Sequence, residues 1–430
     1  MIRSPIPVAL ARPIPSLLLP ATAMRTPSWM RRFQFAADFV TRHALLDSQR
    51  LTMAEIDARH TRLSVRRAAD TSGVSREFSD GAMALTDRGF DSREPWTNLV
   101  PNPFNPRDWT IVNTNNTAEA GNFLGMSNAV RVASQGLTYG RVQSLLDAPL
   151  VVGQVYSARA LYAVGSSPQM RSGIRSAAES NRASLVTGPV GAAAIAGATT
   201  MVTINAVRNI SYGAGLYEVQ YTFTAHEPIN VTFEIGPNIG TPGQDVVAIA
   251  GQVTPTPYQM PWGAGSVDGD SLVIPAADAG LVINPVADAK TFVMVWRGTA
   301  TESSVTFAHL LQARSGAGNL FLQYRKDQNY RLDLNSGSGT STRGLAGALG
   351  SEQVFVVAWR PDGTWLTVDA TGIFTGSRPM FNGALDGISV GCSATDGRGR
   401  VNGTHKLAAI GAFDSFSTAD AQALYDVVAR

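Results

Sequence analysis

Histidine and cysteine, the side chains most often used for metal binding and acid–base chemistry, are sparse in this chain. A transition-metal site needs several such ligands close together, and the sequence has no H-x-x-x-H spacing and no histidine–cysteine group. Cys392 is the one cysteine, which excludes an internal disulfide and a thiolate cluster. The five histidines are His43, His60, His226, His309 and His405. The sequence therefore predicts no transition-metal site.

Ser271 stands in a sequence context that suits a nucleophile. Residues 269–272 read Gly-Asp-Ser-Leu, which resembles the signature of the GDSL hydrolases, where the serine attacks and a later Asp-x-x-His supplies the base. Here His405 is the only late histidine, and Asn402 stands three residues before it. An activated serine needs an oriented base within hydrogen-bond reach. We therefore interpret residues 269–272 as a turn before a strand and predict no enzyme.

Loop carboxylates could hold calcium. Asp369, Asp386 and Asp396 fall near predicted strand ends, and Ca²⁺ takes oxygen ligands from such loops. Aspartate is also a common turn former, and this second interpretation is favoured. We predict no cofactor.

Aromatic and arginine side chains give the best case for a ligand, because sugar rings stack on aromatic faces while their hydroxyls meet polar groups. Arg398 and Arg400, in the glycine-rich stretch DGRGRVNG, could bind acidic sugars. The ordinary alternative for each candidate is a ring in the core or a solvated arginine. The candidate glycan-binding residues are Trp365, Tyr324, Tyr330, Arg331, Arg398 and Arg400.

Strands, rather than helices, must position these residues. Apolar residues make up 44% of the chain and charged residues 16%, with 41 glycines and 23 prolines, which is typical of many short strands joined by turns. Polar and apolar residues alternate with period two over 155–164, 215–225 and 229–236, as in half-buried antiparallel strands. Further strands are predicted at 291–298, 307–315, 319–326, 329–337, 353–371, 387–394 and 405–413.

Local signals mark one hairpin and two helices. Pro361-Asp362-Gly363 predicts a tight turn between two apolar-alternating runs. A short helix is expected from Met53 to Arg62. Ser417, with Asp420 three residues later, predicts the start of a closing helix. One face of that helix would carry Ala421, Leu424, Tyr425 and Val428.

The N-terminal stretch is apolar and rich in proline. Pro7, Arg12, Pro13 and Pro15 interrupt the run that a secretory signal needs, so we expect no cleaved signal. Proline favours an extended arm, which either docks in a groove of a partner or remains a free tail. The sequence contains no 18-residue apolar span, so no transmembrane helix is predicted.

Two segments resemble known sandwich families. Residues 98–110, NLVPNPFNPRDWT, resemble the first strand of carbohydrate-binding-module-like jelly rolls, with Phe104 and Trp109 in the aromatic places. Residues 292–298, 354–376 and 406–427 resemble the concanavalin A-like, laminin-G-like sandwich, whose late strand is followed by a helix with an S-x-A-[DE]…LY pattern.

These resemblances imply an all-β chain with two antiparallel β-sandwiches, jelly-roll-like and then concanavalin A-like. The expected division is an extended docking arm at 1–32, an adaptor region at 33–95, a jelly-roll domain at 96–258, a linker at 259–266 and a concanavalin A-like sandwich at 267–430.

The order of arm, jelly roll and lectin-like sandwich is similar to the spike, fibre and receptor-binding proteins of tailed phages and gene transfer agents. The resemblance implies a structural, adhesive protein on the exposed surface of a virion, a head spike or a tail fibre. Its sandwiches would bind host cell-surface polysaccharide, and its arm would dock to other virion proteins. A homo-oligomer, with a trimer by analogy, is also implied. The arm residues expected to dock are Pro13, Pro15, Leu17, Leu18 and Trp29.

Two alternatives remain. A capsule-degrading enzyme would need paired carboxylates, and the E-x-D-x-E run of lectin-like glucanases is missing from the sequence. A secreted bacterial glycan-binding protein would require cleavage of the first 23 residues. The net charge of +2 gives no reason to expect a nucleic-acid partner.

Overall fold

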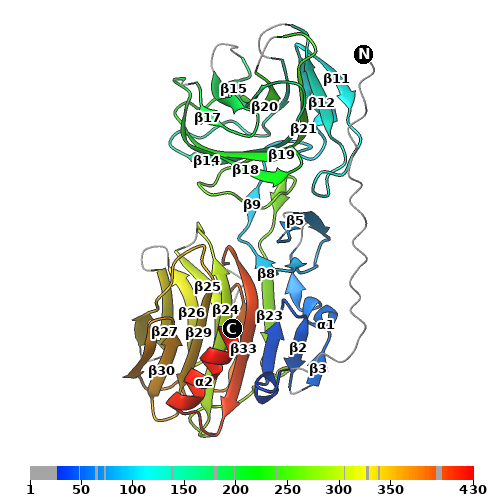
Figure 1. Cartoon of the computed structure of the whole chain (residues 1–430). Coiled ribbons are helices and arrows are strands. Elements are labelled where there is room, and N and C mark those ends of the chain that lie inside the picture. Colours follow the sequence, from blue (N-terminus) through cyan, green and yellow to red (C-terminus); the bar gives the residue numbers. More distant parts are fainter. Residues whose placement is uncertain are drawn as a thin grey trace.

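A computed structural model describes residues 27–47, 49–62, 66–71, 74–136, 140–178, 183–197, 199–238, 241–304, 306–325, 329–337, 339–393 and 400–430. The fold is all-β, as predicted, and consists of two sandwiches of antiparallel sheets that lie one above the other (Figure 1). We call the lower one the composite sandwich (residues 30–62, 83–92 and 270–428) and the upper one the inserted sandwich (residues 98–254).

The composite sandwich has a ten-stranded sheet and a seven-stranded sheet. The ten-stranded sheet contains β3 (Gln49–Leu51), β2 (His43–Leu46), β1 (Phe35–Asp38), β33 (Gly403–Phe413), β24 (Thr291–Ala300), β29 (Gln353–Trp359), β30 (Thr364–Asp369) and β31 (Gly372–Ser377), with β7 (Leu85–Thr86) and β8 (Gly89–Ser92) beside β33. The seven-stranded sheet contains β28 (Thr340–Gly344), β27 (Asn329–Asn335), β26 (Gly318–Arg325), β25 (Phe307–Ser315), β32 (Leu385–Val390), β23 (Ser271–Pro275) and β4 (His60–Thr61).

Strands from both ends of the chain build the composite sandwich. β1 pairs antiparallel with β33, with Phe35 opposite Ile410, and β4 pairs with β23. The expected division set residues 33–95 apart as an adaptor, whereas the strand pairing joins them to both sheets. The reason lies in β33, whose other edge is taken by β24, so that the short β1 covers an edge that would otherwise remain open.

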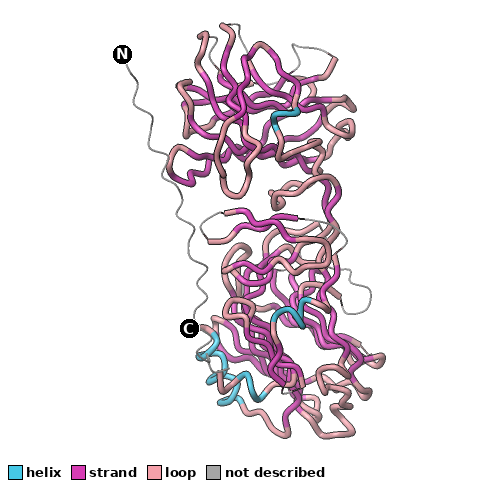
Figure 2. The backbone as a smooth tube through the Cα atoms, turned by 90° about the vertical axis from the view of Figure 1, so that its right-hand side faces the viewer, coloured by secondary structure: helices cyan, strands magenta, loops and turns pink. Residues whose placement is uncertain are grey.

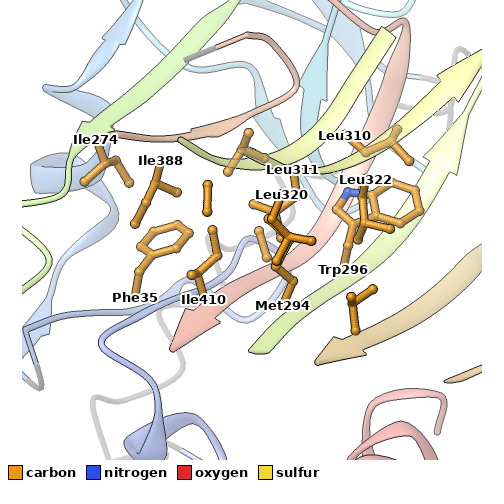
Figure 3. Packing of buried hydrophobic residues seen from close by; sticks show 14 of the residues in the cluster. Phe35, Ile274, Met294, Trp296, Leu310, Leu311, Leu320, Leu322, Ile388 and Ile410 are labelled. Carbon is orange, nitrogen blue, oxygen red and sulfur yellow. The ribbon is translucent and has the colours of Figure 1, made fainter. Parts of the chain in front are cut away.

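Apolar side chains alternate with polar ones along these strands, and the apolar ones from both sheets pack into one core between them. Trp296 stacks on Phe355 with ring centroids 5.9 Å apart, and Phe35 on β1 is as fully buried as Ile410 on β33. Figure 3 shows Met294 and Ile410 from one sheet facing Leu320 and Ile388 from the other. Burial of this large apolar set is the main stabilising term for a domain without a disulfide.

The outer face of the ten-stranded sheet is covered by a helix that the sequence predicted. Helix α2 (Thr418–Val428) begins at Ser417, whose Oγ accepts from the backbone N of Asp420 at 3.1 Å, and it buries Ala421, Leu424 and Val428 against the sheet. The predicted hairpin turn is also confirmed, because Gly363 adopts φ +85° and its N donates to Arg360 O. The early helix is shorter than predicted: α1 spans Met53–Asp57, after the 3₁₀ turn η1 (Met30–Arg32).

The inserted sandwich consists of two six-stranded sheets. The tip sheet, at the top of Figure 1, contains β10 (Thr110–Val112), β13 (Arg141–Leu145), β20 (Val231–Pro237), β15 (Gln169–Ser176), β16 (Ala183–Pro189) and β17 (Ala194–Ile195). The base sheet contains β11 (Thr114–Ala118), β12 (Val130–Ser134), β21 (Asp245–Thr254), β14 (Val155–Val164), β19 (Leu216–Ala225) and β18 (Val202–Gly213).

The stretch Asn98–Pro103, expected to be the first strand of the jelly roll, has no strand assigned. Its prolines lack the N–H groups that a ladder needs, and the chain turns instead into η2 (Pro106–Asp108). The stretch still fixes Trp109, whose ring meets Phe233 edge-on at 5.9 Å in the core. Gly251 is required beside them, because a Cβ there would lie 2.5 Å from the Trp109 ring.

Two narrow strand pairs join the sandwiches (Figures 1 and 2). One is β9 (Trp96–Thr97) with β22 (Ser266–Val267), through which the chain enters and leaves the inserted sandwich. The other is the hairpin β5 (Arg66–Ala69) with β6 (Ser75–Phe78), which lies between the two bodies. Within the described residues, no helix is long and apolar enough to cross a membrane.

Candidate functional site: a polar cleft between the sandwiches

Ser271 and His405 do not form a nucleophile–base pair. Ser271 Oγ lies 3.3 Å from Cys392 Sγ, whose pKa is raised to about 11 by burial. His405 Nδ1 accepts from Trp296 Nε1 at 2.9 Å, and its Nε2 lies 2.7 Å from Ser92 Oγ. Burial lowers the pKa of His405 to about 3, so the ring is neutral and both of its nitrogens are engaged.

Asp270, between the glycine and the serine of that motif, is the hub of a buried ionic cluster. His60, Arg62 and Arg66 contact its carboxylate at 2.9–3.1 Å, and the backbone N of Arg93 donates to Oδ2. Burial alone would raise the pKa of Asp270, but Arg66 and His60 lower it to about 2. The Gly-Asp-Ser-Leu stretch therefore holds the N-terminal strands to β23 rather than presenting a serine.

Three of the predicted glycan-binding rings lie in the core. Tyr324 and Tyr330 are 4% and 0% exposed, and the Tyr330 hydroxyl accepts from the backbone N of Ala300 at 3.1 Å. Trp365, opposite Trp359 in the hairpin, is 7% exposed and packs on Gly376. Period-two alternation turns these rings toward the other sheet, so none of them offers a face to a sugar.

The predicted arginines and aspartates are scattered. Arg331 pairs with Asp333 at 2.5 Å, and Arg400 lies against Gly269. Arg398 and Asp396 lie outside the described residues. Asp386 binds Arg314 at 2.6 Å, while Asp369 accepts from Thr371 and from the Ala346 backbone. In the part of the chain that the structure describes, no group of three or more histidine, cysteine or acidic side chains could hold a metal ion.

The expected docking residues Pro13, Pro15, Leu17 and Leu18 also lie outside the described residues. Trp29 is half-buried against its own domain, where its ring meets Phe33 edge-on at 5.8 Å.

The structure instead brings polar residues together in a cleft between the two sandwiches, with a volume of about 530 Å³. Its walls come from the base sheet, the segment after β21, the β5–β6 hairpin and the edge of the composite sandwich. This size is typical of small-ligand sites. Its lining includes Arg88, Arg93, Arg159, Arg208, Gln259 and Glu302.

Consecutive residues of the hairpin fix the spacing of the cleft. Arg66 points down, where it binds Asp91 and Asp270 in the composite sandwich. Arg67 is directed to the inserted sandwich, where its guanidinium donates to Gly125 O at 2.6 Å and lies over the Phe104 ring. Because successive side chains of a strand point to opposite sides, one short hairpin holds both bodies.

The upper wall is built around Arg159 on β14, which is 9% exposed. Its guanidinium donates to Glu218 and to Met260 O, and it lies 4.0 Å over the Trp262 ring. Burial, together with Glu218, raises the pKa of Tyr212 to about 12, so this phenol remains a donor to Glu218. The Nε of Arg159 is buried and has no hydrogen-bond partner within the described residues.

The segment after β21, expected to be a linker at 259–266, lies across the base sheet and is held there by side-chain hydrogen bonds. Gln259 Nε2 donates to Ala158 O and Tyr221 O, and Gln252 Nε2 donates to Met260 O and Pro261 O. These side-chain bonds replace a strand ladder and make the segment part of the wall.

The lower wall is built around Glu94 and Asn402, which are both 1% exposed. The Glu94 carboxylate accepts from Asn402 Nδ2 at 2.8 Å and from Tyr258, which belongs to the segment above. Nearby, Arg93 binds Asp91 at 2.6 Å, and its Nε is a second buried guanidinium atom without a partner in the described chain.

A second arginine cluster lies on the outer face of the tip sheet. Arg141, Arg171 and Arg175 contact Glu234 at 2.9–3.2 Å, and all four side chains are at most 10% exposed. This cluster is closed to solvent, so we interpret it as structural.

Sequence reasoning missed the cleft because its residues come from many separate stretches of the chain, between Ala68 and Thr404. The usable signals were indirect: Arg159 breaks the apolar alternation of β14, and Glu218 and Gln220 lie opposite or beside it on β19.

No family model and no curated protein matches the chain. Solved structures with distant similarity include the CBM40 domain of the Ruminococcus gnavus IT-sialidase, at 13% identity over 32% of this chain and 83% of that one, with a TM-score of 0.26. Mouse laminin α1 domains LG4-5 match at 11% identity over 68% and 90% of the two chains, with a TM-score of 0.25. The CBM22-1-CBM22-2 tandem of Paenibacillus barcinonensis Xyn10C matches at 7% identity over 75% and 99%, also with a TM-score of 0.25. Similarity of this size carries no ligand or activity over to this chain.

Proposed function

We propose that this chain is a non-enzymatic glycan-binding protein and that its ligand lies in the cleft between the sandwiches. The observation that carries the proposal is the wall itself: Arg88 and Arg208 are exposed, they line an open cleft from opposite sandwiches, and neither has an ion pair or a side-chain hydrogen bond among the described residues. Guanidinium groups that face an open cleft keep free N–H donors, and sugar hydroxyls are suitable partners for such donors.

The absence of catalysis is part of this proposal. Hydrolysis of a glycosidic bond needs two carboxylic groups at a defined separation, one of them an acid. Of the carboxylates in the walls, Asp91 is held by Arg66 and Arg93 on its two oxygens, and Glu94 is buried among the donors of Asn402 and Tyr258, which leaves Glu302 alone. We expect no new reducing ends when the protein is incubated with a polysaccharide that it binds.

A neutral steric block tests the site. Ala69 is exposed on the hairpin and lines the cleft, so Ala69→Trp fills the space without removing a polar group. The matched control is Ala370→Trp, at an exposed turn that does not line the cleft. Screening against a glycan array should show binding by the parent and by the control and loss of binding by Ala69→Trp. Equal binding by all three would place the ligand elsewhere.

We further propose the role implied by the sequence resemblance, an adhesive spike or tail fibre on the surface of a phage or phage-like particle. The support is the proline-rich N-terminal stretch followed by one sandwich into which a second is inserted. Antibody labelling of particles from a producing strain, viewed by electron microscopy, should decorate the head or tail. Recovery of the protein only from the particle-free medium would favour a secreted bacterial glycan-binding protein.

A further inference from the structure

We propose that the ligand of the cleft is a linear acidic polysaccharide, whose anionic groups are bound by Arg88 on one sandwich and Arg208 on the other. This inference rests on the proposed glycan-binding function and adds the chemical class and the extended shape of the ligand.

Charge is the first observation. The cleft is lined by four arginines and two carboxylates, an excess of two positive charges. Arg93 and Arg159 are committed to Asp91 and Glu218. Arg88 and Arg208 are exposed, and in the described part of the chain neither forms an ion pair or a side-chain hydrogen bond. Glu302 is the one carboxylate of the lining left to balance Arg88 and Arg208, so one net positive charge remains on the two arginines that a ligand can reach.

Position is the second observation. Arg88 lies in the turn between β7 and β8 of the composite sandwich, while Arg208 lies on β18 of the inserted sandwich. One ligand in the cleft would meet a guanidinium from each body. A guanidinium presents a planar fork of donors that matches a carboxylate or another oxyanion, and Arg is the side chain best suited to such pairing.

Shape is the third observation. A hollow of about 200 Å³ adjoins the cleft and shares Arg208, Gln220 and Gln259 with it. A hollow of about 320 Å³ adjoins the other side and shares Arg88. The two free arginines thus lie where the cleft passes into its neighbours, which suits a chain of several sugar units better than a single compact ligand.

The experiment compares one polymer in two charge states. Binding of the full-length protein to polygalacturonate is measured by calorimetry beside the same polymer after carboxyl reduction, with dextran as a neutral reference and single-stranded DNA as a different polyanion. We expect binding to polygalacturonate that weakens as salt is raised and at least tenfold weaker binding to the reduced polymer.

The variants Arg88→Gln and Arg208→Gln should each weaken polygalacturonate binding by about tenfold. Arg208→Lys, which keeps the charge but not the fork, should retain more of it than Arg208→Gln. The matched control is Arg50→Gln, an exposed arginine on the edge strand β3 that makes the same change in net charge. Melting temperatures of all variants confirm that each is folded.

Each outcome has a distinct meaning. Equal affinity for the reduced and the acidic polymer, with loss of both in Ala69→Trp, would overturn the acidic ligand and leave the glycan-binding function standing. Equal affinity for single-stranded DNA, or equal loss in Arg50→Gln, would show general attraction of polyanions and overturn the inference. Binding of none of these polymers, together with an empty glycan array, would overturn the proposed function as well.

Discussion

The cluster around Asp270 and the cleft above it contain the same kinds of side chain and differ in what is left unsatisfied. At Asp270 both oxygens are engaged and the carboxylate is closed to solvent. In the cleft, Arg88 and Arg208 are open to solvent and have no ion pair among the described residues. The comparison teaches that gathered charge alone does not indicate a binding site; accessible and unmet hydrogen-bonding capacity does.

The largest expected effect comes from removing the centre of the closed cluster. Asp270→Asn keeps the shape but leaves Arg62 buried without its counter-charge and Arg66 with Asp91 alone, so the free energy of unfolding should fall by about 3–5 kcal/mol in urea titrations. The control is Asp278→Asn, in a surface pair with Arg59, where the loss should be below about 1 kcal/mol. Equal losses of stability in the two variants would show that the buried cluster contributes no more than a surface ion pair.

Arg159 shares features of the closed cluster and of the open cleft. It is buried and paired with Glu218, as in the cluster, yet it lines the cleft. Arg159→Gln leaves Glu218 buried without its cation, and the free energy of unfolding should fall by about 1.5–3 kcal/mol. Calorimetry should also show weaker glycan binding by the folded variant. If the variant loses stability but keeps full affinity for the glycan, Arg159 has a structural role only.

Acid should weaken the composite sandwich. Burial lowers the pKa of His405 to about 3, below its ordinary value near 6.5 in the unfolded chain. Between these two values the unfolded chain binds a proton that the folded chain does not, so this contribution to stability is present above pH 6.5 and is lost as the pH falls toward 3. The slope from this one group is at most about 1.4 kcal/mol per pH unit.

Asp270, with its pKa lowered to about 2, adds a further loss of stability below the ordinary aspartate range. In urea titrations made at several pH values, His405→Gln should make the free energy of unfolding less dependent on pH above pH 4. His226→Gln, at an exposed ring, should leave it unchanged. Parallel pH curves for the parent and His405→Gln would show that another group causes the acid sensitivity.

The smallest expected change in stability belongs to the open arginines. Arg88→Gln and Arg208→Gln should alter the free energy of unfolding by no more than about 0.5 kcal/mol, because each side chain is exposed and has no ion pair to lose. Thermal melts check this directly. A large destabilisation would mean that these residues hold the two sandwiches together rather than serve a ligand.

The sequence predicted the elements much better than their assembly. Alternation located β14 and β25 at the ranges observed, and Ser417 marked the start of α2, because these signals are local. The pairing of β1 with β33 joins residues almost four hundred positions apart, which a single sequence does not encode in any local pattern. For that reason residues 33–95 were interpreted as a separate adaptor.

The candidate site was predicted less well for a related reason. Tyr330 and Trp365 were chosen for their chemistry, yet their place in the alternation put them between the sheets. Arg88 and Arg208 carry no motif, and they line one cleft only because the β5–β6 hairpin holds one sandwich above the other.

The pairing of β1 with β33 also limits the order in which the two sandwiches can fold during synthesis. During synthesis, β1–β3 leave the ribosome on the order of half a minute before β33 is made. The inserted sandwich has all its strands by residue 254 and can fold in that interval, while the earliest strands remain unpaired. Expression in pieces should therefore favour residues 98–254 as a soluble fragment, whereas a fragment starting at residue 267 would expose the apolar edge of β33 and aggregate.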